Sequence, residues 1–271
     1  VATAIGTGGP GAVFWMWMVG LLGMATKYSE GLLAVKFRVR AKDGSYIGGP
    51  MYALERGMGQ KWLGVLFALF TGFAGFGLGN MVQGNSIAES CLNTFGIPKF
   101  ATAAVLTVLT GLVILGGVQS ISKVCEKLIP FMAGLYILGC VIICFINAPY
   151  MGAAFSTIIK GAFNPQAVGG GFVGATIGAC IRAGVSRGLF TNESGLGSAP
   201  IVDACAATRN PARQALISMS GVFWDTIVVC LLTGLVLVSA ILKDPVGMEG
   251  LVGANLTAGA FGAIPVVGPA V

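Results

Sequence analysis

The chain has 271 residues, of which 55% are hydrophobic and 10% are charged, and its mean hydropathy is +0.87. Soluble domains carry about 25% charged residues, so this composition excludes an ordinary soluble protein and predicts an all-α membrane protein in a lipid bilayer. The net charge of +6 does not indicate nucleic-acid binding, because the basic residues lie in short loops rather than on one continuous face.

Membrane-spanning helices need about 20 mostly apolar residues each. Residues 1–8 are interpreted as the end of a helix that began earlier, and the sequence Gly-Gly-Pro at 8–10 breaks it. Spans are predicted at about 11–35, 62–92, 100–118, 128–147, 169–206 and 214–242, with a surface helix at 48–59 and a connection with a short amphipathic piece at 148–168. The span 169–206 is predicted to be broken because it is too long and too polar for one plain helix. We interpret 1–271 as one transmembrane domain, truncated at both ends.

The basic residues predict the orientation of these spans. Ten lie on the side of the loop 36–61, whereas the opposite side has Lys99, Lys160 and Lys243. The ten are Lys36, Arg38, Arg40, Lys42, Arg56, Lys61, Lys123, Lys127, Arg209 and Arg213. Cytoplasmic loops carry an excess of Lys and Arg, so we expect this loop to be cytoplasmic and the protein to be multi-pass in the cytoplasmic membrane. The alternation of sides requires 169–206 to cross the membrane once.

The polar stretch 187–200, RGLFTNESGLGSAP, is the strongest functional signal in the chain. Glycine and proline can open a helix, and the freed N–H and carbonyl groups can then bind an anionic group or a cation. The helix-opening residues are Gly188, Gly195, Gly197 and Pro200; the polar ones are Thr191, Asn192, Ser194 and Glu193, the last as a buried charge, an ion ligand or a helix-end cap. The alternative is a glycine-rich packing face. Packing alone would not require Asn, Glu and Ser in one turn, so the pattern favours a functional site.

Two other polar groups lie within predicted spans. Asn80 and Gln83 are three residues apart on one helix face, and their amides could bind a polar ligand or join helices by hydrogen bonds; their spacing does not separate these two possibilities. Asp225 and Thr226 lie in the middle of a span, where a charge needs a partner. Asp225 could bind a cation, cap broken backbone or pair with Arg182 or Arg187, and pairing is favoured.

Four segments resemble the sodium:alanine/glycine symporter family: 8–38, 48–59 (GGPMYALERGMG), 188–200 (GLFTNESGLGSAP) and 210–226 (NPARQALISMSGVFWDT). The resemblance implies the inverted-repeat fold of LeuT-type transporters, in part: residues 1–8 match the end of the first core helix, and the spans match helices two to seven. Ser194 stands where family members commonly have Ala. The family's break in helix one and its eighth helix fall outside the chain, so we expect this fragment not to transport by itself.

The resemblance also assigns residues and a function. Gln83 matches the family's substrate glutamine, and Phe190 to Ser194 match the break in its sixth helix. The implied function is sodium-coupled symport of alanine or glycine by alternating access, with sodium as coupling ion and no cofactor; the alternative is a proton-coupled transporter with Glu193 or Asp225 as the proton site. The substrate-binding candidates are Gln83, Phe190, Thr191, Asn192 and Gly195, and the ion-binding or gating candidates are Glu193, Ser194, Asp225 and Thr226.

Two other function classes fit the sequence less well. An intramembrane enzyme would use a His, a catalytic dyad or a metal-binding set, but the chain has no His and none of these sets is visible. A channel would need a continuous polar pore, whereas these polar residues cluster near one depth. The sequence therefore predicts a transporter and not an enzyme.

Overall fold

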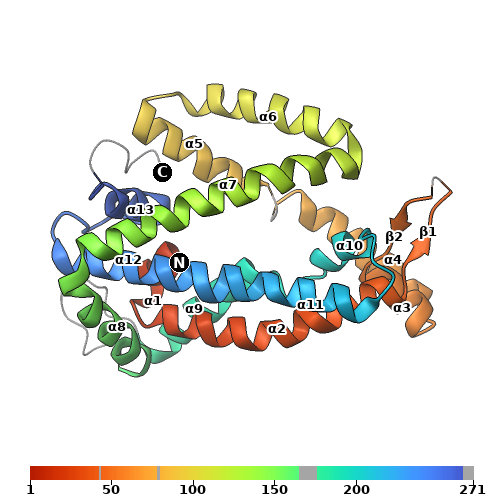
Figure 1. The fold of residues 1–271 in the computed structure, drawn as a ribbon, viewed down its shortest axis with the longest axis horizontal. Coiled ribbons are helices and arrows are strands. Elements are labelled where there is room, and N and C mark those ends of the chain that lie inside the picture. Colours follow the sequence, from red (N-terminus) through yellow and green to blue (C-terminus); the bar gives the residue numbers. More distant parts are fainter. Residues whose placement is uncertain (43, 78–79, 165–175, 265–271) are drawn as a thin grey trace. The chain divides into compact units, whose positions relative to one another are not determined.

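A computed structural model describes residues 1–42, 44–77, 80–164 and 176–264 (Figure 1). These residues form two compact units, which are described separately below. The first unit contains Thr3–Phe76 and Thr157–Leu231, and the second contains Gly77–Ser156 and Leu232–Val271.

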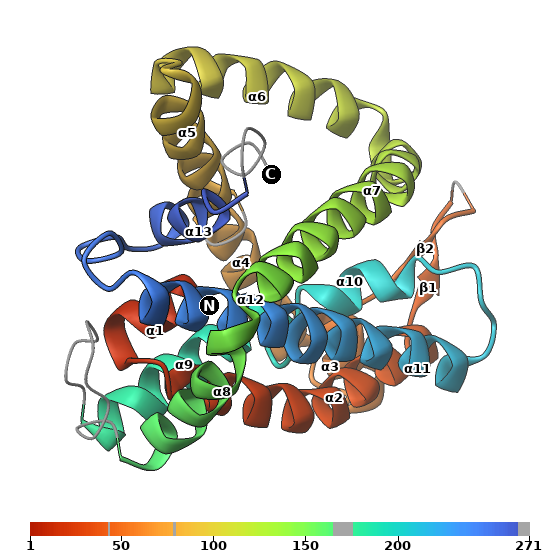
Figure 2. The ribbon, with the colours of Figure 1, turned by 60° about the vertical axis from the view of Figure 1, so that its left-hand side comes forward.

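Helix α2 (Ala12–Lys36) is the centre of the first unit. The elements that it packs against include α9 (Ile177–Asn192), α10 (Ala199–Ala204), α11 (Pro211–Val222) and the π-helix η2 (Phe223–Val229). The views in Figures 1 and 2 both show α2 running alongside α11. The short α1 (Ala2–Gly8) precedes α2, and Gly9 ends it with φ 75°.

Small residues bring α9 close to α2. A Cβ atom at Gly184 would collide with the carbonyl of Ala12, and one at Gly188 would lie 3.2 Å from the Cβ of Val19. Small residues four apart allow helix backbones to approach closely in membranes. Helix α9 therefore has a glycine-rich packing face. It lies at Gly184 and Gly188, before residues 193–198.

A small hairpin is an exception to the all-α prediction. Strands β1 (Val39–Arg40) and β2 (Tyr46–Ile47) pair antiparallel, with Val39 opposite Ile47 and Arg40 opposite Tyr46. The guanidinium of Arg38 lies 3.8 Å from the centre of the Tyr46 ring, which fixes the hairpin to the end of α2. Helix α3 (Pro50–Gly57) follows and corresponds to the expected surface helix.

The segment 62–92, which the sequence predicts as one span, contains two helices in the structure. Helix α4 (Lys61–Gly75) ends before α5 (Met81–Phe95) begins, and the described residues between them, 76–77 and 80, are not helical. The run FAGFGLGN, from 73 to 80, contains three glycines. Each glycine costs a helix about 1 kcal/mol relative to alanine. The run 73–80 is therefore long and apolar but has a low helix propensity.

The second unit contains α5, α6 (Lys99–Leu115), α7 (Gly117–Ile146), α13 (Ala254–Phe261) and all but the first two residues of α12 (Cys230–Lys243). Helix α6 packs against both α5 and α7, and α13 contacts the same two helices. The ring of Tyr136 stacks on Phe261 at 5.4 Å, and its hydroxyl is 2.8 Å from that of Thr233. Helix α7 begins eleven residues before the expected span 128–147 and includes Pro130.

Two stretches within the described residues are long and apolar enough to cross a membrane, Gln119–Ile146 and Pro211–Lys243. The second runs through α11, η2 and α12 without interruption and contains the predicted span 214–242. Large apolar side chains are highly exposed, as at Phe100 and Leu115 of α6, which are 86% and 87% exposed. Lipid accepts such a surface. The expected connection at 148–168 contains the 16-residue helix α8 (Ala148–Phe163).

Candidate functional site

The polar stretch contains a helix break, which runs from Glu193 to Ser198 between α9 and α10. Glu193 ends α9 in the left-handed conformation, with φ 52°, and it is the one non-glycine residue with positive φ among those the structure describes. Left-handed residues are a common way to end a helix. Phe190 to Asn192 were expected in the break, but they form the last turn of α9. The first part of the predicted broken span, up to residue 175, lies outside the described residues.

Helix α2 contacts the end of α9 and the start of the break through three hydrogen bonds from three successive turns. The Ser194 hydroxyl donates to the Gly23 carbonyl at 3.0 Å, and the Lys27 ammonium donates to the Asn192 carbonyl at 3.2 Å. The backbone N–H of Gly195 donates to Oε1 of Glu30 at 3.1 Å. Positions 23, 27 and 30 are four and three residues apart, which puts them on one face of the helix. One face of α2 therefore holds residues 192–195.

The break is also bonded within itself. The N–H of Ser194 donates to Oδ1 of Asn192 at 2.9 Å, and the Ser198 hydroxyl donates to Oε2 of Glu193 at 2.9 Å. The Thr191 hydroxyl donates to the carbonyl of Arg187, one turn earlier in α9, at 2.9 Å. The side chains of Thr191, Asn192 and Glu193, which the sequence predicts as ligands, therefore already have hydrogen-bond partners within the protein.

The candidate residues of this segment differ in accessibility. Asn192 and Ser194 are each 4% exposed and face α2. Phe190 and Thr191 are half-buried, whereas Glu193 and Gly195 are exposed. A Cβ atom at Gly195 would meet no atom within 4 Å, so the backbone at Gly195 can be approached directly. The open part of the site is therefore the last turn of α9 together with Gly195.

The far end of α10 is held by two further groups. The Arg38 guanidinium donates to the carbonyls of Ala204, Ala206 and Thr208, at 3.1, 2.6 and 2.7 Å. Oδ1 of Asp203 accepts hydrogen bonds from Gln214 at 2.9 Å and from Ser218 at 2.7 Å, which ties α10 to α11. The short helix after the break is therefore fixed to both α2 and α11.

Asp225 and Thr226 lie at the start of the π-helix η2. Thr226 is fully buried against α2, where a Cβ atom at Gly20 would lie 2.9 Å from its Cγ2. The Thr226 hydroxyl donates to Oδ2 of Asp225 at 3.4 Å, and Asp225 is otherwise exposed. The favoured pairing of Asp225 with Arg182 or Arg187 is wrong, because neither arginine, both of which the structure describes, forms an ion pair with it. Single π turns inside α-helices occur often at functional sites.

Gln83 belongs to the second unit. It lies in the first turn of α5 and is exposed, while Asn80 precedes the helix as its N-cap residue. The two amides were expected on one helix face, but only Gln83 is in the helix. Its role as a substrate ligand stays a prediction.

The sequence interpretation missed Lys27 and Glu30. Both lie in the second half of the predicted span 11–35, and Lys27 is only 8% exposed. An ionisable residue inside a membrane span is expensive and is usually functional. That rule was applied to 187–200 and to Asp225, and it would also have identified this pair.

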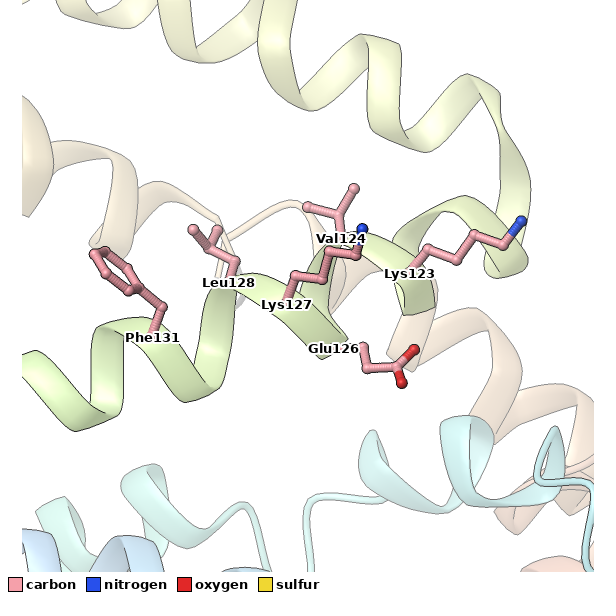
Figure 3. A pocket seen from close by; sticks show the side chains of 6 residues that line it. All are labelled: Lys123, Val124, Glu126, Lys127, Leu128 and Phe131. Carbon is pink, nitrogen blue, oxygen red and sulfur yellow. The ribbon is translucent and has the colours of Figure 1, made fainter.

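A hollow of about 550 Å³ lies beside α7 in the second unit. Its lining residues are Lys123, Val124, Glu126, Lys127, Leu128 and Phe131. All six come from one helix, and Figure 3 shows Glu126 pointing away from the two lysines. Without convergent polar groups, this hollow does not resemble a ligand site. The described residues also contain no group of three or more Cys, Asp or Glu side chains placed to hold a metal ion.

Comparison with known proteins gives one consistent result. The profile of the sodium:alanine symporter family matches residues 1–270. An uncharacterized transporter of Haemophilus influenzae is 53% identical over 96% of this chain and 57% of its own length, and the sodium/alanine symporter AgcS of Methanococcus maripaludis is 52% identical over 99% and 59%. A putative sodium/proton-dependent alanine carrier protein of Bacillus subtilis is 43% identical over 85% of this chain and 46% of its own length. The chain spans less than two thirds of the length of each relative.

Proposed function

Because the chain belongs to the sodium:alanine symporter family, a family of membrane transporters and not of enzymes, we propose that it forms part of a sodium-coupled symporter for a small neutral amino acid, alanine or glycine. The transporter would lie in the cytoplasmic membrane. Since the chain spans 57% and 59% of the length of the first two relatives described above, transport is assigned to the full-length protein.

The break at 193–198 is the observation that carries this proposal. In transporters of this kind, half-helix ends and unwound backbone bind the substrate and the coupling ion. Here α9 ends at Asn192, and the backbone at Gly195 is open. The proposed fold is the partial LeuT-type inverted repeat, from the end of helix one to helix seven, and the proposed mechanism is alternating access around this break.

We assign the substrate to Gln83, Phe190, Thr191, Asn192 and Gly195, with different roles. Phe190 and Thr191 are half-buried in the last turn of α9 and would form a wall of a small side-chain pocket. The open backbone at Gly195 would contact the substrate's charged groups, and the amide of Gln83 would add a polar contact. Asn192 is buried and bonded to Ser194, so it would act by shaping the end of α9.

The coupling ion is assigned to the polar groups at the break and on η2. Glu193 and Asp225 are exposed carboxylates, and Ser194 and Thr226 are buried hydroxyls. Sodium is a hard cation that prefers oxygen ligands, as calcium and magnesium do. The alternative, a proton-coupled transporter with Glu193 or Asp225 as the proton site, is kept because one relative bears the name of a sodium/proton-dependent alanine carrier.

Uptake of labelled alanine by the full-length protein in proteoliposomes tests the proposal, with the sodium gradient and the pH gradient imposed separately. We expect uptake to follow sodium and to vanish in sodium-free buffer. Uptake in sodium-free buffer driven by an imposed proton gradient would favour the alternative. Counterflow of labelled substrate distinguishes a carrier from a channel, because only a carrier exchanges internal for external substrate.

A further inference from the structure

We propose that Lys27 and Glu30 are positioning residues of the transport site, which set the geometry of the break at 193–198 from the adjoining face of α2. This inference rests on the proposed function, because the break is taken to be where substrate and sodium bind. It assigns a role to two charged residues that the substrate and ion candidates do not include.

Lys27 satisfies the carbonyl end of α9. The last turn of a helix leaves carbonyls without intrahelical partners and carries a partial negative charge, so a cation is stabilised there. The ammonium of Lys27 is buried and lies 3.2 Å from the carbonyl oxygen of Asn192, the last residue of α9. In this arrangement the Asn192 carbonyl is already bonded to a cation, and a sodium ion beside it would be repelled. Sodium is therefore expected at other oxygens of the site.

Glu30, one turn further along α2, accepts a hydrogen bond from a backbone N–H group after the end of α9. Gly195 lies outside both helices, with φ 83°, and its N–H has left the hydrogen-bonding pattern of α9. The carboxylate of Glu30 accepts that N–H at 3.1 Å. Since a cation and an anion three residues apart on a helix face offset each other's charge, α2 can bring both to this depth of the membrane.

The two residues contact the two sides of Glu193, the residue at which the helix opens. Lys27 bonds to the residue before it, and Glu30 bonds to the second residue after it. The left-handed backbone of Glu193 is therefore held from both sides by one rigid helix. Positioning groups of this kind raise affinity by preorganising a site, without touching the ligand.

The test uses the full-length protein with Lys27→Met and Lys27→Arg, and with Lys243→Met as a matched control. Lys243 also forms a lysine hydrogen bond, from its ammonium to Oδ1 of Asn147 at 3.1 Å, but it lies at the end of α12 in the second unit. Three quantities are measured: hydrogen exchange of the segment 189–198, the alanine affinity from ligand-protected melting, and the sodium concentration for half-maximal protection.

We expect Lys27→Met to speed exchange in 189–198 at least tenfold, to weaken alanine binding at least tenfold and to raise the sodium requirement. Lys27→Arg keeps a donor, so its alanine affinity and its sodium requirement should both lie close to those of the wild type. Glu30→Gln keeps an acceptor oxygen and should change them less than Glu30→Met does. Lys243→Met should leave the exchange of 189–198 and both binding constants unchanged, whatever it does to the melting temperature.

Wild-type exchange in 189–198 and wild-type ligand constants in folded Lys27→Met protein would overturn the proposal and leave Lys27 with a purely structural role. If Lys27→Met and Glu30→Met do not fold, Glu30→Gln decides, because loss of the carboxylate charge must change the exchange or the sodium requirement at least threefold, and an unchanged Glu30→Gln protein would overturn the proposal. The exchange measurement needs no ligand. Failure of wild-type protein to bind alanine with sodium would contradict the proposed function, while faster exchange in Lys27→Met would still support the positioning role.

Discussion

The hydroxyl of Ser194 lies 3.0 Å from the carbonyl oxygen of Gly23, so the break touches α2 at a residue that has no side chain. A Cβ atom at Gly23 would lie 2.8 Å from Nδ2 of Asn192 and 3.2 Å from Oγ of Ser194. That Nδ2 atom is buried and has no hydrogen-bond partner among the described residues. The absence of a side chain at Gly23 therefore allows the buried residues Asn192 and Ser194 to lie against α2.

Gly23→Ala should displace the break and weaken sodium-dependent alanine binding about tenfold, because the added methyl group contacts two buried polar side chains. Ligand-protected thermal melting measures the effect. Gly111→Ala in α6 is the matched control, since a Cβ atom there would meet nothing within 4 Å. Alanine is the better helix former by about 1 kcal/mol, so the control should be neutral or slightly stabilising. Unchanged affinity in Gly23→Ala would show that the break tolerates a shift away from α2.

Gly195→Ala and Gly195→Val should both abolish transport while the protein stays in the membrane. With φ 83° and open space around the Cβ position, the cost is backbone strain of about 1–3 kcal/mol rather than a clash. The effect should therefore not scale with side-chain size. Gly197→Ala provides the contrast: Gly197 also has positive φ, 78°, so the strain is shared, but its Cβ would in addition lie 2.5 Å from Cζ of Phe67 and should lower the melting temperature further through the clash. If alanine in sodium buffer stabilises the Gly195→Val protein as much as the wild type, the break is not part of the binding site.

Gln83→Ala should weaken alanine binding with normal expression. A lost hydrogen bond to the ligand costs about 0.5–1.5 kcal/mol, and more if the ligand group is charged, which corresponds to a weakening of about two- to tenfold. Isothermal titration or protected melting measures it. Gln119→Ala, at another exposed glutamine, in α7, is the control. Equal affinities for the Gln83 variant and the wild type would show that Gln83 does not contact the substrate.

Arg38→Lys should lower the melting temperature by several degrees. The guanidinium donates to three carbonyls at the end of α10 and stacks on Tyr46, whereas an ammonium is a point charge that cannot reproduce the fork or the stacking. Arg40→Lys is the control, because Arg40 is exposed and its bond to the Gly44 carbonyl is long, 3.4 Å. Similar melting temperatures for the two variants would contradict the role of Arg38.

The cytoplasmic placement of the loop 36–61 can be tested with single added cysteines. The ten-to-three distribution of loop Lys and Arg predicts that the thiol introduced by Lys42→Cys is protected from an impermeant thiol reagent in intact cells and reacts after permeabilisation. Lys160→Cys, on the opposite side, should react in intact cells. The parent protein, with its seven free cysteines, sets the background. Labelling of position 42 from outside intact cells would invert the topology.

The sequence by itself determined the family, through its long motifs, and the helical membrane character, through its apolar length. It also pointed to a helix break within 187–200, because glycine and proline act locally and are visible in a short window. The profile match over 1–270 confirmed the family, and the end of α9 at Asn192 agrees with the predicted broken span. The same local reasoning did not show that the segment 62–92 contains two helices, α4 and α5, because its apolar length suggested one continuous element.

Only the tertiary structure decided which groups of the polar stretch are open and which are used inside the protein. Asn192 and Ser194 appeared to be free ligands in the sequence, but they bond to each other and to α2. Gly195 and Gly197 appeared equivalent, yet one faces open space and the other faces Phe67. The contact of Lys27 with Asn192 joins residues 165 positions apart. Such a contact depends on how α2 and α9 pack, and this packing follows from the close approach at Gly184 and Gly188, of which only Gly188 belongs to the stretch 187–200.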